Sequence, residues 1–254
     1  AIATKPNSSA YMVDPGAATK VLALLPGQTL NEGTGGANPN PLVQDTHVSN
    51  PPTLQVAGTA FNASLIITDN WFNIIDDDTT SLDVATFNND SIATSAGAAV
   101  ALNGTATVSI TNRHQESNLS IVADHATYTN VTSTNYSVDH GAASTTIVIL
   151  PSQVHAQGQN SLAAAVSGTV DAQEVDVAFD VVVKLTDDWY NVVDQNDALT
   201  ITLSDTNATA PGTPATFTNG SATFSMTNKT AGTTHTITAS SAYTNKSSNQ
   251  YTVN

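Results

Sequence analysis

Two short segments of the chain are near copies of each other. Residues 68–76 and 186–194 both read Thr-Asp-x-Trp, an aromatic residue, Asn, two aliphatic residues and Asp, and they contain both tryptophans. The copies occupy the same place in a longer recurrence that spans nearly all of the 254 residues. A chain of this length can bury two separate cores, so the repeat predicts two domains in series.

The segment before each copy has the pattern of a half-buried β-strand. Apolar residues alternate with other residues, and a period of two places the apolar side chains on one face of a strand. The alternating positions are Phe61, Ala63, Leu65 and Ile67 in the first repeat and Val175, Val177, Phe179, Val181, Val183 and Leu185 in the second.

Turn signals recur between further short apolar runs. Asn-Gly pairs at 103–104 and 219–220 favour the positive φ angles of a tight turn. Each repeat contains about seven such runs, which is the pattern of an antiparallel β-sandwich. The predicted fold class is therefore all-β, with two tandem sandwiches at residues 17–139 and 140–254 after an N-terminal junction segment at 1–16.

The sequence Tyr-x-Val followed by Asp or Asn occurs three times and brackets the two repeats. Tyrosine has an apolar body and a polar tip, which suits packing at a module boundary better than stacking on a sugar. We therefore predict that these residues form inter-module junctions. They are Tyr11, Val13 and Asp14, then Tyr136, Val138 and Asp139, and finally Tyr251 and Val253.

The order of these motifs resembles that of bacterial immunoglobulin-like repeats, as in invasin, intimin-type adhesins and large surface or filament proteins. The resemblance rests on the alternating strand, the D-x-W-x-N segment, the Asn-Gly turn and a closing Thr-x-Thr-Ile-Thr-Ala at 234–239. It covers residues 17–135 and 142–250, with Trp71 and Trp189 where the family usually has a glycine. The resemblance implies immunoglobulin-like sandwiches, a structural or adhesive extracellular role and no catalytic residues.

Charge and composition exclude several classes of partner. Six Lys and Arg residues against 21 Asp and Glu residues give a net charge of -15, which repels nucleic acid and anionic lipid. No apolar run approaches the ~20 residues of a membrane-spanning helix, so membrane insertion is not expected. The chain has no cysteine, which excludes disulfides and thiolate catalysis. Few cations, many hydroxyl groups and no thiols favour an extracellular or cell-surface location.

The acidic residues around each Trp copy are candidate ligands for calcium, the one cofactor that the sequence suggests. Calcium is bound by carboxylate, amide and backbone oxygens, which an acidic loop can supply. The alternative is that the first Asp of each copy binds backbone N–H groups of a turn, while the Trp caps the core. The candidate ligands are Asp69, Asn73 and Asp76, with Asp77 and Asp78 beside them, and Asp187, Asn191 and Asp194, with Asp188 and Asp197.

Tripeptides of the form Asn-x-Ser or Asn-x-Thr are possible acceptors of N-linked glycans. Asn, Ser and Thr are abundant here, so much of their number follows from composition alone. The candidates are Asn62, Asn103, Asn118, Asn219 and Asn228.

The sequence has no nucleophile-elbow, phosphate-loop or dinucleotide motif, so the predicted function is non-enzymatic. We expect an extracellular structural module, either a repeat segment or a protomer of a surface filament, stalk or array assembled head to tail. Its partners would be copies of itself or adjacent repeats of the same chain, with residues 1–14 adding a strand to a neighbouring sheet. The alternative is an adhesin that binds glycans or a host protein through the loops at 29–53 and 204–214.

Overall fold

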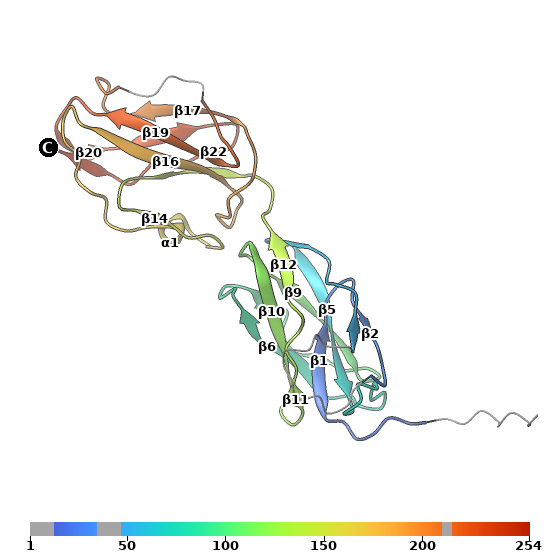
Figure 1. Ribbon diagram of the computed structural model, residues 1–254. Helices are drawn as coiled ribbons and strands as arrows, with labels where there is room; N and C mark the ends of the chain where they lie inside the picture. Colours follow the sequence, from blue (N-terminus) through green and yellow to red (C-terminus); the bar gives the residue numbers. More distant parts are fainter. Residues whose placement is uncertain (1–12, 35–46, 210–214) are drawn as a thin grey trace, which may run out of the picture.

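The computed structural model describes residues 13–34, 47–209 and 215–254, which form two β-sandwiches joined end to end (Figure 1). The first sandwich contains strands β1 to β12 and the second contains β13 to β23. The prediction of an all-β fold with two tandem immunoglobulin-like sandwiches is confirmed. Within the described parts of the chain, no helix is long and apolar enough to cross a membrane.

The first sandwich has two five-stranded sheets and a short hairpin. One sheet has the order β11-β1-β5-β9-β7, with strands Thr129–Asn130, Lys20–Leu24, Ala60–Thr68, Thr105–Thr111 and Thr94–Ser95. The other has the order β4-β12-β10-β6-β8, with strands Gln55–Val56, Tyr136–Asp139, Glu116–Asp124, Ser81–Asn88 and Ala99–Val100. The hairpin pairs β2 (Thr29–Leu30) with β3 (Val48–Ser49).

The second sandwich repeats this architecture. Its first sheet has the order β19-β16-β13-β22, with strands Ser221–Thr227, Ala178–Thr186, Thr145–Ile149 and Thr244–Asn245. The opposite layer consists of β18 (Ala215–Thr216), β17 (Ala198–Leu203), β21 (Ile237–Ser240), β20 (Gly232–His235) and β23 (Tyr251–Val253). The hairpin is β14 (Val154–His155) with β15 (Val166–Ser167), and it encloses a one-turn helix, α1 (Leu162–Ala165), that the sequence did not predict.

The alternating pattern of the central strands accounts for the two cores. In β16 the side chains of Val181, Val183 and Leu185 are fully buried, and the residues between them are more exposed. In β5 the residues at 63, 65 and 67 are buried in the same way. The buried residues form a separate apolar cluster in each sandwich, so each sandwich has a core of its own.

The recurring Tyr-x-Val motif belongs to the last strand of each sandwich rather than to a junction. Tyr136 in β12 and Tyr251 in β23 are buried in the core of their own sandwich, as are Val138 and Val253. Each tyrosine hydroxyl donates to a buried asparagine: Tyr136 to Asn112 at 2.7 Å and Tyr251 to Asn228 at 3.1 Å. The prediction that these tyrosines pack between modules is therefore wrong, because each completes the core of its own sandwich.

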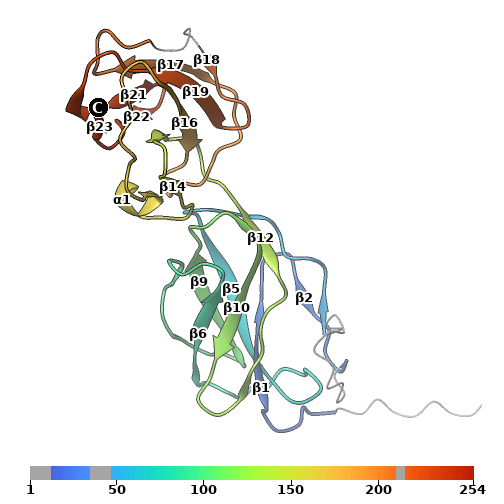
Figure 2. The same ribbon diagram turned by 60° about the vertical axis from the view of Figure 1, so that its left-hand side comes forward.

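The two sandwiches meet at one end of each. In both views the segment around β14 and α1 lies beside the end of the first sandwich (Figures 1 and 2). The chain enters the first sandwich at its opposite end, and the C-terminus lies at the far end of the second (Figure 1). Each sandwich therefore has an entry end and an exit end, and the exit end of the first contacts the entry end of the second.

Candidate inter-module interface

A carboxylate organises the turn after β16. Asp187 accepts hydrogen bonds from the backbone amides of Trp189 and Asn191, both at 2.9 Å, and from the Asn191 side chain at 2.9 Å. A fourth hydrogen bond comes from the backbone amide of Gly141 at 2.7 Å. A carboxylate has about four acceptor positions. All of them are used to hold a turn in which Tyr190 has a φ of 60°, in the left-handed region.

The turn after β5 in the first sandwich is built in the same way. Asp69 accepts from the backbone amides of Trp71 at 2.8 Å, Asn73 at 3.0 Å and Gly16 at 2.9 Å, and from the Asn73 side chain at 2.9 Å. Burial alone raises the pKa of the Asp69 carboxyl, but the hydrogen bonds from Asn73, Gly16 and Trp71 outweigh it and lower the pKa below its ordinary value. In both copies the first Asp therefore binds backbone N–H groups of the turn, as the alternative to calcium binding predicts.

In the second sandwich the turn presents Trp189 to the first sandwich. The indole packs against the apolar cluster of the first sandwich. The guanidinium of Arg113 lies 4.4 Å from the centre of the indole ring, and it is held there by a hydrogen bond to the carbonyl of Ile92 at 2.8 Å. A Cβ atom on Gly58 would lie 2.3 Å from Nε1 of Trp189. Only a glycine at position 58 therefore allows the indole to approach this closely.

Asn191 is the polar link between the two sandwiches. Its side chain is fully buried. The Oδ1 atom accepts from the backbone amide of Gln115 at 3.0 Å, and Nδ2 donates to the backbone carbonyl of Arg113 at 2.8 Å. The amide group thus satisfies one donor and one acceptor of the first sandwich while it also binds Asp187 in its own turn.

A loop contact completes the interface. Gly158, in the loop before α1, lies against His114, and a Cβ atom on this glycine would come within 2.7 Å of the His114 Cβ. The side chain of Gln115 donates to Asp139 at 3.2 Å. Asp139, a residue of the predicted junction motif, thus binds the side chain of an interface residue within the first sandwich.

Trp71 occupies the equivalent position in the first sandwich, but its side chain is 53% exposed. The prediction that each Trp caps its own core is therefore wrong. Trp189 packs against the core of the neighbouring sandwich, whereas the side chain of Trp71 lies on the surface of the first.

The acidic residues predicted to bind calcium do not form one cluster. Asp76, Asp77 and Asp194 are exposed, whereas Asp69 and Asp187 are bound to their turns. Among the residues that the structure describes, no group of three or more His, Cys, Asp or Glu side chains could hold a metal ion. Calcium binding therefore stays a prediction, and melting curves with and without chelator can test it.

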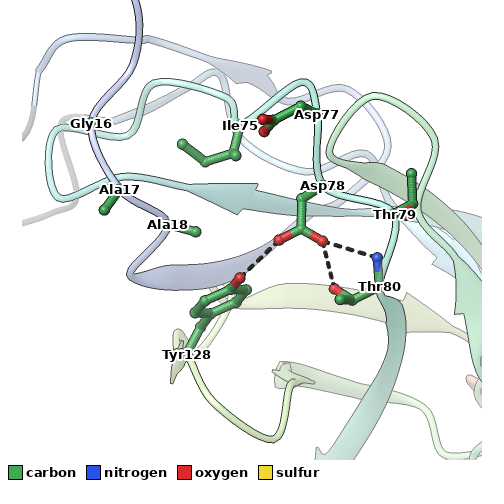
Figure 3. A pocket seen from close by; sticks show the side chains of 9 residues that line it. All are labelled: Gly16, Ala17, Ala18, Ile75, Asp77, Asp78, Thr79, Thr80 and Tyr128. Carbon is green, nitrogen blue, oxygen red and sulfur yellow. Dashed lines mark hydrogen bonds between the residues drawn. The ribbon is translucent and has the colours of Figure 1, made fainter.

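A shallow pocket of about 490 Å³ lies beside the acidic loop of the first sandwich (Figure 3). Asp78 accepts from the hydroxyl of Tyr128 at 2.8 Å and from the backbone amide of Thr80 at 2.9 Å. Burial raises the pKa of Asp78, but these hydrogen bonds outweigh it and the pKa is lowered overall. The carboxylate thus ties the loop to the segment that follows β10. The lining residues are Gly16, Ala17, Ala18, Ile75, Asp77, Asp78, Thr79, Thr80 and Tyr128.

The candidate glycosylation sites differ in exposure. Asn62, Asn103, Asn118 and Asn219 are exposed. Asn228 is only 1% exposed, and its side chain donates to Asp205 and accepts from Tyr251. The prediction for Asn228 is therefore wrong for the folded protein, since a glycan could not reach a buried amide.

Several predicted features fall on residues 1–12, 35–46 and 210–214. Tyr11, most of the segment 1–14 proposed to add a strand, and parts of both loops proposed to bind glycans lie outside the described residues. Val13 and Asp14 are described and exposed. Strand addition and glycan binding therefore stay predictions.

No family model matches the sequence, and no curated protein matches it. Solved structures do match. The Escherichia coli adhesin FdeC matches 95% of this chain and 66% of its own length, with 14% identity and a TM-score of 0.37. The D00-D0 domain of intimin matches 92% of this chain and 99% of its own length, with 9% identity and a TM-score of 0.40. A glycosyl hydrolase family 2 member from Bacteroides cellulosilyticus matches 82% of this chain and 25% of its own length, with 13% identity and a TM-score of 0.35.

The structures that this chain resembles thus include the adhesin and intimin domains that the sequence motifs indicated. The chain spans just under two thirds of the FdeC structure and a quarter of the hydrolase.

The sequence did not predict the interface residues of the first sandwich. Gly58, Arg113 and Gln115 belong to no motif, and their partners in the second sandwich lie far along the chain. The second repeat has different residues at all three places, and only their contacts in the structure mark them as interface residues.

Proposed function

We propose that the chain is a non-enzymatic structural element of a cell-surface protein, with two β-sandwich modules joined end to end as a stiff spacer in a stalk, filament or surface array. The observation that supports this most directly is the joint. It combines a buried asparagine bonded to both sandwiches, an Arg–Trp stack and two close glycine contacts.

Such a joint resists bending because its polar contacts are directional and buried. Rotating one sandwich against the other would break the two hydrogen bonds from Asn191 to the first sandwich and expose the indole of Trp189. Each buried hydrogen bond contributes about 1 kcal/mol net, and more is lost if its partners stay buried. A cation–π contact adds about 1 kcal/mol. A spacer needs this property, since a flexible linker would not hold the modules in line.

The test is small-angle X-ray scattering of the intact chain, with Trp189→Ala as the variant that weakens the joint and Trp71→Ala as its matched control. We expect a single elongated shape for the unaltered chain and for Trp71→Ala, and a distribution of bent shapes for Trp189→Ala. Scattering that requires freely moving modules in the unaltered chain would refute the spacer function.

A further inference from the structure

The entry end of the first sandwich repeats the docking geometry that the second sandwich uses. We name the surface formed by Gly33, Trp71 and Asn73 the Trp71 face. Asn73 stands where Asn191 stands in the second sandwich, with the same hydrogen bonds to the turn carboxylate. Trp71 stands where Trp189 packs on its neighbour, yet its indole is more than half exposed.

The glycine of the loop contact is also duplicated. Gly33 has a φ of 71° and Gly158 a φ of 69°. Gly33 lies four residues after the start of β2, and Gly158 lies four residues after the start of β14. A Cβ atom on Gly158 would collide with His114 of the first sandwich. Among the described residues, a Cβ atom on Gly33 would meet only the side chain of Asn73, at 3.8 Å. No described residue therefore takes the place at the Trp71 face that His114 takes at the joint.

The exit end of the second sandwich does not match the exit end of the first. Asp176 stands at the position of Gly58. Asp176 has a φ of 64° and donates its backbone amide to the carbonyl of Asn228, and Gly58 has a φ of 76° and donates to the carbonyl of the equivalent Asn112. At position 58 the first side-chain carbon would already overlap the indole. An aspartate at this place therefore closes the site that receives a tryptophan.

The second difference involves the cation. Lys229 replaces Arg113, and its ammonium pairs with the carboxylate of Asp176. An arginine stacks flat on an indole, whereas a lysine presents a compact point charge and is here held by a neighbouring acid. The exit end of the second sandwich thus lacks both the space and the cation that hold Trp189 at the joint.

We propose that the Trp71 face binds the exit end of another β-sandwich module, one with a glycine at the Gly58 position and an arginine at the Arg113 position. The partner is thus a preceding module of the first type, and the exit end of the second sandwich is excluded as that partner by Asp176. The sequence before Gly16 supports this, because Tyr11, Val13 and Asp14 have the spacing of the last strand that precedes Gly141. The proposal rests on the proposed function as a tandem spacer, whose joint it extends to a further module.

The experiment is a three-module chain in which residues 1–141 are followed directly by residues 17–254. Gly141 then precedes Ala17, as it precedes Ala142 in the natural joint. Trp71→Phe in the first copy leaves two tryptophans, the Trp71 of the middle module and Trp189. Acrylamide quenching of their fluorescence is compared with that of the natural chain. We expect the readily quenched component, which comes from the exposed Trp71, to be lost in the three-module chain.

The control is the same chain with Gly58→Asp in the first copy. Aspartate is compatible with this backbone, since Asp176 has the same left-handed conformation. We expect the quenched component to return. If Trp71 stays as quenchable in the three-module chain as in the natural one, the docking proposal is overturned, while the spacer function, tested by scattering of the natural chain, can still stand. Equal protection with Gly58→Asp would overturn the choice of partner.

Discussion

Truncating Asn191 to alanine should weaken the joint far more than truncating Asn73, although the two residues sit in the same turn. Asn73→Ala removes one side-chain hydrogen bond, to Asp69, at a partly exposed site. Such a bond contributes about 1 kcal/mol. Asn191→Ala removes the matching bond to Asp187 and also the two bonds to Gln115 and Arg113. At about 1 kcal/mol each, the expected loss is about 3 kcal/mol, and the difference between the variants is about 2 kcal/mol.

Differential scanning calorimetry of the natural chain and both variants measures this difference. For a domain of ordinary size, 2 kcal/mol corresponds to a separation in melting temperature of about 10 °C. The loss should appear in the transition of the second sandwich, because the turn of Asn191 belongs to it. Asn73→Ala is the internal control for the turn itself. Equal destabilisation by the two substitutions would show that the inter-module bonds contribute nothing, and the account of the joint would be refuted.

Three further predictions concern the interior and the acidic turns. Burial raises the pKa of Asp205, but hydrogen bonds from Lys229, Asn207 and Thr230 outweigh it and lower the pKa to about 2. The pKa of an Asp in the unfolded chain is about 4. The ionised carboxylate therefore stabilises the fold fully above pH 4, and this contribution is lost as the pH falls towards 2. The melting temperature should therefore fall more steeply between pH 6 and pH 2 for the natural chain than for Asp205→Asn. Equal pH dependence of the two melting temperatures would contradict the assignment. Tyr251→Phe leaves the side-chain Oδ1 of buried Asn228 without its donor and should lower the free energy of unfolding in urea by about 1–2 kcal/mol; Tyr243→Phe, at a partly exposed site, should lower it less. Melting curves in calcium and in chelator test the calcium prediction: bound calcium should raise the melting temperature and chelator should reverse the rise, whereas identical curves in the two conditions would remove the calcium site.

The sandwiches could be predicted from the sequence because their signals are local. Alternation along residues 61–67 and 175–185 places one face of β5 and of β16 in the core, whatever the partner strands are. The turns after these strands were predictable for a similar reason. Asp69 and Asp187 accept hydrogen bonds from backbone amides two and four residues further along the chain, so the motif itself contains both partners of each bond.

The role of the recurring tyrosines was not predictable in this way. A residue that returns once per repeat can mark a boundary or the last strand of a core, and both give the same spacing. The deciding partners are Asn112 and Asn228, which lie 24 and 23 residues before the tyrosines that bind them. Nothing in the local sequence identifies these asparagines as buried acceptors.

The duplicated turn separates what local structure requires from what docking requires. Asp and Asn are needed in both copies, because the turn with a left-handed aromatic residue depends on their hydrogen bonds. The tryptophan is not needed by the turn, since no hydrogen bond of Asp69 or Asp187 involves its side chain. At position 189 the neighbouring sandwich explains it. At position 71 the indole is 53% exposed, and among the described residues only Asn73 lies near Gly33, which is the arrangement that a docking surface for another module requires.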